Sequence, residues 1–101
     1  MVEEISEAEI IKLAGVFSAL GNPLRLKILK IVSTSDRPLH IKAVARLTKT
    51  RYALAYKHVK TLETAGLVTI YEVGRSRVVA VKSHDAFERV VSMGKELIVE
   101  K

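Results

Sequence analysis

The segment Arg51–Arg77, with the sequence RYALAYKHVKTLETAGLVTIYEVGRSR, decides the fold of this chain. Residues 51–65 have the length and spacing of a helix, and Gly66 ends it. Residues 67–73 and 76–82 are rich in Val, Ile and Tyr, which predicts two strands folded back at Gly74. Polar and basic side chains crowd the outward positions. A helix or a two-stranded ribbon can enter a DNA groove, so the segment favours nucleic-acid binding.

The helices before this segment carry local start and stop signals. Ser6 and Glu9 form a capping box that begins the first helix, and Gly21 ends it. Asn22 and Pro23 then begin a second helix as N-cap and first helical residue.

A polar turn over residues 33–38 precedes a short third helix that begins near His40. A final helix begins at Ser83 or Asp85. The order ααααββα predicts a mainly helical α+β fold. At 101 residues, without a linker or repeat, the chain 1–101 is expected to be a single domain.

Basic charge is concentrated in the middle of the chain. Residues 23–82 hold thirteen Lys and Arg residues against three acidic residues, whereas residues 1–22 and 83–101 are each net acidic. The total formal charge is +6. This distribution places the positive potential on the predicted helix and hairpin, as a phosphate-contacting surface requires.

Composition excludes several classes of protein. No apolar run approaches the roughly 18 residues of a membrane span, and no signal-peptide layout appears, so a cytoplasmic location is expected. The absence of Cys excludes disulfides and thiolate metal sites. There is no Gln and a single Asn, Asn22, which together with abundant Lys, Arg and Glu indicates a thermophilic source.

Three stretches resemble a known family when taken together. They are residues 19–29 (ALGNPLRLKIL), residues 57–68 (KHVKTLETAGLV) and residues 72–75 (EVGR). The chain resembles the ArsR-type winged helix-turn-helix repressors over essentially its whole length, although either long stretch alone also fits other winged-helix families, such as MarR-type regulators.

The resemblance implies a homodimeric transcription factor with its fourth helix in the major groove. Residues 40–65 would form the helix-turn-helix and residues 67–82 the wing hairpin. The end helices, 1–21 and 84–101, would form the dimer interface.

The sequence departs from the family in places that bear on the effector. The metal sensors of the family have a Cys-x-Cys pair on the third helix, where this chain has Val44-Ala45-Arg46-Leu47. Tyr56 replaces a usual Ser, and Lys49 and Arg51 replace the Gly and Ser of the turn. The effector therefore stays unknown: a small molecule between the end helices, a partner protein or no effector at all.

The fourth helix has two faces. Ala55, Val59 and Leu62 share one side and are expected to pack on the core. The candidate DNA-contacting residues lie on the other side and at the start of the helix: Arg51, Tyr52, Tyr56, Lys57 and Lys60. The alternative is an ordinary solvated helix face. His58 lies between the faces and is expected to make a structural hydrogen bond.

Arg75 and Arg77 bracket the hairpin tip and are the candidate wing contacts to DNA. The alternative is a charged loop that only prevents edge-to-edge sheet pairing.

The apolar stripes of the first and last helices exceed what one small core needs. They predict a dimer interface, in which Gly94 allows close approach of a partner backbone. The alternative is that each helix packs on its own domain. The predicted interface residues are Ile10, Leu13, Phe17, Phe87, Val91, Gly94, Leu97 and Ile98.

Catalytic and metal-binding patterns are absent from the sequence. Ser83, His84 and Asp85 are adjacent and cannot converge as a triad. A metal site around His84, Asp85 and Glu88 would need ligands from Glu96 or Glu100, and none is expected. We predict no enzyme activity and no cofactor.

These inferences together predict a homodimeric, sequence-specific regulator of double-stranded DNA, a repressor by family resemblance. Two alternatives stay open. One is an architectural protein that binds DNA without sequence preference, and the other is a winged-helix domain that recruits a protein partner through its end helices.

Overall fold

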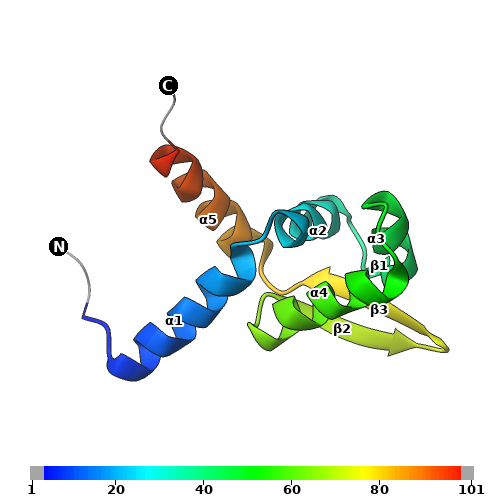
Figure 1. Ribbon diagram of the computed structural model, residues 1–101, viewed down its shortest axis with the longest axis horizontal. Coiled ribbons are helices and arrows are strands. Elements are labelled where there is room, and N and C mark those ends of the chain that lie inside the picture. Colours follow the sequence, from blue (N-terminus) through cyan, green and yellow to red (C-terminus); the bar gives the residue numbers. More distant parts are fainter. Residues whose placement is uncertain (1–3, 99–101) are drawn as a thin grey trace.

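The computed structural model describes residues 4–98 and has five helices and three strands over that range (Figure 1). The helices are α1 (Glu7–Leu20), α2 (Pro23–Thr34), α3 (Ile41–Leu47), α4 (Tyr52–Thr64) and α5 (His84–Leu97). The strands are β1 (Leu39–His40), β2 (Val68–Val73) and β3 (Ser76–Val81). The predicted winged helix-turn-helix is confirmed. Residues 1–3 and 99–101 of the predicted end helices lie outside the described residues.

The local start signals form as the sequence predicts. Ser6 and Glu9 make both hydrogen bonds of the capping box at α1. The Oδ1 atom of Asn22 accepts hydrogen bonds from the amides of Leu24 and Arg25, at 2.9 and 3.0 Å, and Pro23 opens α2. Of the two expected starts for α5, Ser83 is the N-cap. These ends need no tertiary contact, because each cap satisfies amides within its own helix.

The order ααααββα was incomplete, because a short strand precedes α3. Leu39 and His40 of β1 pair antiparallel with Val79 and Val78, which makes a three-stranded sheet in the order β1-β3-β2. The sequence predicts a polar turn that ends at Pro38 and a helix that begins near His40, with no strand between them. Two residues carry no periodicity, so only their pairing with β3 defines them as a strand.

The core lies among α2, α3, α4 and the sheet. Residues with no exposed surface come from each of these elements: Ile28, Leu29, Ile41, Val44, Ala55, Val59, Leu62 and Val79. The burial of Ala55, Val59 and Leu62 confirms the predicted inner face of α4. This core holds α4 rigidly against the domain with its other face outward.

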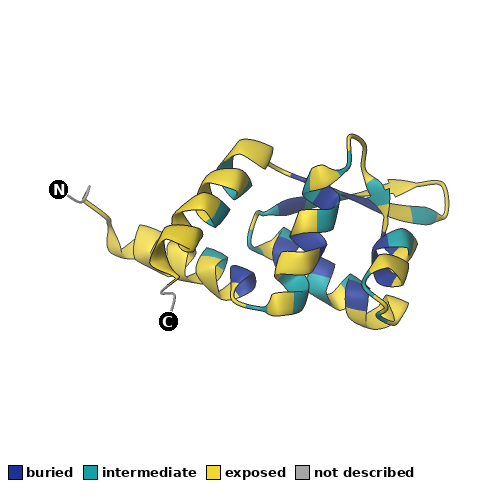
Figure 2. Ribbon diagram, turned by 90° about the horizontal axis from the view of Figure 1, so that it is seen from above, coloured by how far each residue is buried: buried dark blue, intermediate teal, exposed yellow. Residues whose placement is uncertain are grey.

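The end helices contribute little to this core. In Figure 2 α1 and α5 are almost entirely exposed, whereas the buried residues gather in the body of the domain. Only Ala19 and Leu20 at the end of α1 are buried, and α5 has no buried residue. Both helices extend from the body on the same side of the molecule (Figure 1).

Candidate nucleic-acid interface

The outward face of α4 begins at a helix N-cap. Arg51 has extended backbone angles and is the N-cap rather than a helical residue. The helix therefore begins at Tyr52, one position later than predicted. Tyr52 is 37% exposed, Lys57 and Lys60 are exposed, and Tyr56 is half-buried. The predicted residues of α4 are therefore all at least partly accessible on the outer side of the helix.

Tyr52, Tyr56 and Arg77 form one stack, which we call the aromatic–arginine stack. The two tyrosine rings are nearly parallel, with an interplanar angle of 5° and centroids 6.2 Å apart. The guanidinium carbon of Arg77 lies 4.8 Å from the centroid of the Tyr56 ring, within the range of a cation–π contact. Hydrogen bonding to Tyr52, followed by the charge of Tyr56, raises the pKa of Arg77. The stack joins β3 to α4.

Lys60 is paired on its own helix. Its Nζ lies 2.8 Å from Oε1 of Glu63, and this hydrogen bond raises the pKa of Lys60 and lowers the pKa of Glu63. A phosphate would have to compete with Glu63 for this ammonium group. Lys57 has no such partner among residues 4–98.

The wing hairpin turns at Gly74 and Arg75. Gly74 has a φ of +62°, which costs glycine little because it has no Cβ. Arg75 is exposed at the turn and Arg77 lies two residues further along β3. A crevice of about 60 Å³ separates the hairpin from the starts of α3 and α4, and it is lined by His40, Lys42, Tyr52, Arg75, Ser76 and Arg77.

Lys42 is a further basic residue of this region and is not among the residues predicted from the sequence. It is exposed on α3 and lines the same crevice as Arg75 and Arg77. Its place beside the wing depends on the pairing of β1 with β3, which the sequence pattern did not reveal. The basic surface therefore extends from α4 and the wing onto α3.

The turn between α3 and α4 is closed by internal hydrogen bonds. The Thr48 hydroxyl donates to the carbonyl of Val44 at 2.8 Å, and the Thr50 amide donates to the carbonyl of Ala45 at 2.8 Å. Lys49 has a φ of 55°, in the left-handed region that favours glycine. The predicted break at residues 48–50 is thus a strained, well-bonded turn that sets the angle between the two helices.

His58 makes the predicted structural hydrogen bond. Its Nδ1 lies 3.1 Å from Nη1 of Arg25 on α2, and the ring is half-buried. Burial, and then the charges of Arg25 and Lys57, lower the pKa of His58. The residue therefore anchors α4 to α2.

Solved structures share this arrangement. A homodimeric winged helix-turn-helix DNA-binding domain from Mycobacterium bovis, a possible ArsR-family transcriptional regulator, aligns with a TM-score of 0.80 at 22% identity, over 99% of this chain and 94% of that chain. An ArsR family transcriptional regulator aligns with a TM-score of 0.67 at 27% identity, over 85% and 94% of the two chains. HlyU from Vibrio cholerae aligns with a TM-score of 0.73 at 18% identity, over 89% and 96%.

The fold is that of the ArsR-type winged helix-turn-helix regulators. The resemblance seen in the sequence is thereby confirmed. No protein-family profile matches the chain, and no curated protein sequence matches it.

In this ArsR-type fold, the end helices expose most of the predicted interface residues. Exposed fractions are 46% for Ile10, 42% for Leu13, 58% for Phe17, 81% for Leu97 and 66% for Ile98. A side chain added at Gly94 would meet no atom within 4 Å. Val91 is half-buried.

Phe87 differs from the other predicted interface residues. It is half-buried and packs against the core of its own domain, so part of its surface is already used.

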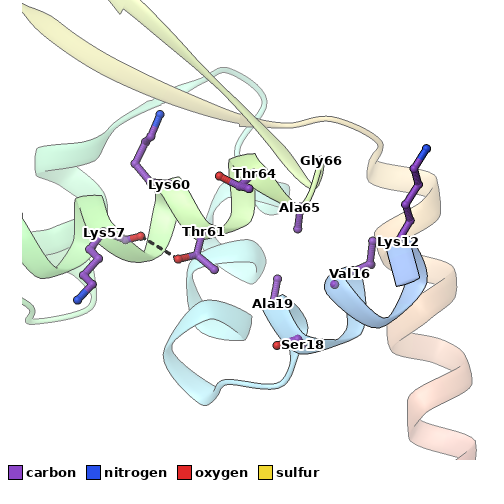
Figure 3. A pocket seen from close by; sticks show the side chains of 11 residues that line it. Lys12, Val16, Ser18, Ala19, Lys57, Lys60, Thr61, Thr64, Ala65 and Gly66 are labelled. Atoms are coloured by element: carbon purple, nitrogen blue, oxygen red, sulfur yellow. Dashed lines mark hydrogen bonds between the residues drawn. The ribbon is translucent and has the colours of Figure 1, made fainter. Parts of the chain in front are cut away.

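An open groove of about 800 Å³ runs between α1 and the second half of α4 (Figure 3). Its floor is made of small residues such as Gly15, Ala19 and Ala65. Lys57 and Lys60 leave α4 in opposite directions, and Lys12 points outward from α1 (Figure 3). The three ammonium groups do not converge, so the groove offers no built anion site.

Residues 4–98 contain no cluster of three or more His, Asp or Glu side chains that could hold a metal ion. Asp85, one of the ligands weighed from the sequence, instead pairs with Arg89 at 3.0 Å. Within the same described range, no helix is both long and apolar enough to cross a membrane.

Proposed function

We propose that this protein is a homodimeric regulator of transcription that binds double-stranded DNA sequence-specifically and acts as a repressor. The observation that carries the proposal is one accessible basic surface, formed by α4 and the wing, on a rigid core. Arg51, Tyr52, Tyr56, Lys57 and Lys60 would contact the major groove and its flanking phosphates, and Arg75 and Arg77 would serve the wing.

Electrostatics supports DNA as the partner. Residues 23–82 carry a net charge of +10, and these residues form α2 to β3, including α4 and the wing. Lysine and arginine contacts to phosphate release counterions, so binding should weaken linearly with the logarithm of salt concentration. A DNA-binding regulator acts where DNA is found, which supports the cytoplasmic location expected from the sequence.

Self-association is supported by the exposed apolar surface of α1 and α5. Phe17 and Leu97 lose the benefit of burial in an isolated chain, and a two-fold partner can cover both helices. The structurally similar domain from Mycobacterium bovis is itself homodimeric. A two-fold dimer would present two α4 helices about 34 Å apart, which predicts a pseudo-palindromic site with half-sites one DNA turn apart.

The test is fluorescence anisotropy across a salt series. The labelled duplexes are the DNA upstream of the gene that encodes this protein and a scrambled control of equal length. Binding to the upstream DNA that is tighter by about three or more orders of magnitude supports sequence-specific regulation. Reporter expression from the same upstream DNA, with and without the protein, then distinguishes repression from activation.

Two other outcomes favour the alternatives. Equal and steeply salt-dependent binding to both duplexes, and to every genomic fragment in a selection experiment, indicates an architectural protein. Absence of binding to any duplex at physiological salt favours a protein-interaction module that uses α1 and α5.

A matched pair of lysine variants tests the role of α4. Lys57→Ala should lower the magnitude of the slope of log affinity against log salt by about 0.9, as expected for one lost phosphate contact. Lys30→Ala, at an exposed position of α2, is the control and should leave the slope unchanged. An unchanged slope for Lys57→Ala would remove Lys57 from the interface.

A further inference from the structure

The two arginines of the wing differ in their surroundings. Both are exposed, but Arg77 also lies in the aromatic–arginine stack, 4.8 Å from the Tyr56 ring centroid, whereas Arg75 lies at the turn. Tyr56 in turn stacks on Tyr52 one helical turn away. One arginine thus lies at the hairpin turn, and the other, although it is also solvent-accessible, bridges β3 and α4.

Strand geometry places Arg77 on the side of the hairpin that faces α4. Successive side chains of a strand alternate between the two faces of a sheet, so Arg77, Val79 and Val81 share a face. Val79 and Val81 are buried in the core. Glu72 lies directly opposite Arg77 in the β2–β3 register. The orientation of Arg77 toward Tyr56 therefore follows from the same pairing that builds the core.

The outer part of the hairpin has few other attachments. Within residues 4–98, β1 pairs with β3 only at Val78 and Val79, so beyond Val78 the backbones of β2 and β3 pair only with each other. Val73 is 57% exposed and Tyr71 is 50% exposed. A two-stranded hairpin is marginally stable by itself, so a side-chain attachment to a rigid helix decides how its tip is oriented.

We propose that Arg77 is a positioning residue: its stack on Tyr56 sets the orientation of the wing relative to α4, and Arg75 is the wing residue that contacts a DNA phosphate. The assignment to DNA rests on the proposed function, whereas the positioning role concerns the free protein. The proposal assigns different roles to Arg75 and Arg77, which the sequence alone does not distinguish.

Arginine chemistry makes the proposal testable with a charge-preserving change. A planar guanidinium stacks on an aromatic ring, whereas the compact ammonium group of lysine does so less well and still binds phosphate as a point charge. If Arg77 positions the wing, Arg77→Lys therefore weakens its contact with Tyr56. If Arg77 binds phosphate, the same change largely preserves binding. Tyr56→Phe keeps the ring, and Tyr56→Leu removes it.

The first experiment uses the protein without DNA. NMR should show an upfield ring-current shift for the Arg77 side-chain protons and slow amide exchange in residues 71–77. The shift should be lost in Tyr56→Leu, the slow exchange should be lost in both Arg77→Lys and Tyr56→Leu, and both signals should be retained in Tyr56→Phe. Unshifted Arg77 protons in the wild type, or unchanged amide exchange in both stack-breaking variants, would overturn the positioning role.

The second experiment measures affinity for a duplex across a salt series. Arg77→Lys should weaken binding about three- to tenfold, without a change in the salt slope. Combining it with Tyr56→Leu should add little to the effect of Tyr56→Leu alone, because both changes break one contact. Arg75→Ala should instead lower the magnitude of the slope by about 0.9.

Arg89→Lys on α5 is the matched control, since Arg89 is exposed and, among residues 4–98, pairs only with Asp85 on its own helix. It should bind as the wild type does. Wild-type affinity for Arg77→Lys, together with a reduced slope for Arg77→Ala, would make Arg77 a phosphate ligand and overturn the proposal. If the wild type binds no duplex, the proposed function fails, and the NMR result still decides the positioning role.

Discussion

The Nη1 atom of Arg25 lies 3.1 Å from Nδ1 of His58, and this contact ties α2 to α4. The same guanidinium donates from Nε to the carbonyl of Ala19 at 2.6 Å and from Nη2 to the carbonyl of Ser18 at 3.3 Å. Arginine only donates hydrogen bonds, so Nδ1 of His58 is the acceptor, and the neutral ring carries its proton on Nε2. Arg25 therefore links the end of α1 to the helix proposed to read DNA.

The Arg25–His58 contact predicts a pH dependence of stability. The folded protein lowers the pKa of His58 from 6.5, mainly through burial and also through the charges of Arg25 and Lys57. The unfolded chain then binds the proton more readily, so the stabilisation is fully present above pH 6.5 and is lost as pH falls from there through the folded-state pKa.

Urea unfolding at about pH 7.5 and about pH 5.5 measures this dependence. The wild type should be less stable at the lower pH, and His58→Gln should remove this part of the difference. His84→Gln, an exposed histidine at the start of α5, is the control. An equal pH dependence in the wild type and His58→Gln would contradict the prediction.

Replacing Arg25 should destabilise the fold. Arg25→Lys keeps the charge but cannot reach two carbonyls and His58 at once, so we expect a loss of about 2 kcal/mol in the free energy of unfolding. Arg37→Lys, whose side chain is 83% exposed, should change stability by less than about 0.5 kcal/mol. Equal unfolding midpoints for the two variants would show that the Arg25 contacts contribute little.

Lys49 occupies a position that favours glycine. A left-handed backbone costs a residue with a side chain about 1–2 kcal/mol of folding free energy. Glycine avoids this strain but costs about 0.5–1 kcal/mol, because it loses more conformational entropy on folding. Lys49→Gly should therefore raise the melting temperature or leave it unchanged, whereas Lys49→Val should lower it. Lys42→Gly, in the first turn of α3, is the opposite control and should lower the melting temperature. A lower melting temperature for Lys49→Gly would show that the side chain of Lys49 is itself stabilising.

The proposed dimer predicts that charges on the end helices release monomers. Phe17 is 58% exposed and Leu97 is 81% exposed. Phe17→Glu and Leu97→Glu place carboxylates at these two apolar positions. Sedimentation should give twice the chain mass of 11.2 kDa for the wild type and the single mass for the double variant. Leu47→Glu, a 56% exposed position on α3, should stay dimeric. A monomeric wild type at micromolar concentration would refute the dimer.

Local signals explain what could be predicted from the sequence. Ser6, Asn22 and Ser83 cap helices with hydrogen bonds that span two or three residues, so neighbouring residues suffice to identify them. The buried face of α4 follows from helical periodicity alone, as Ala55, Val59 and Leu62 show. The concentration of positive charge in residues 23–82 follows from the order of residues along the chain and needs no coordinates.

The features that could not be predicted from the sequence depend on contacts between residues far apart in the chain. β1 exists as a strand because Leu39 meets Val79, and Lys42 lies beside the wing for the same reason. Arg75 and Arg77 are alike in the sequence, and only the tertiary structure places Arg77 against a tyrosine of α4 and leaves Arg75 at the turn.

The sequence by itself determined the helices, the caps that begin α1 and α2, the hairpin and the basic centre of the chain, because each arises from neighbouring residues or from periodicity. Only the tertiary structure decided which side chains pair across elements: Arg25 with His58, and Arg77 with Tyr56. These pairs join residues 33 positions apart in one case and come from different elements in both. Such contacts form when burial of the core brings the elements together, and local propensity does not encode them.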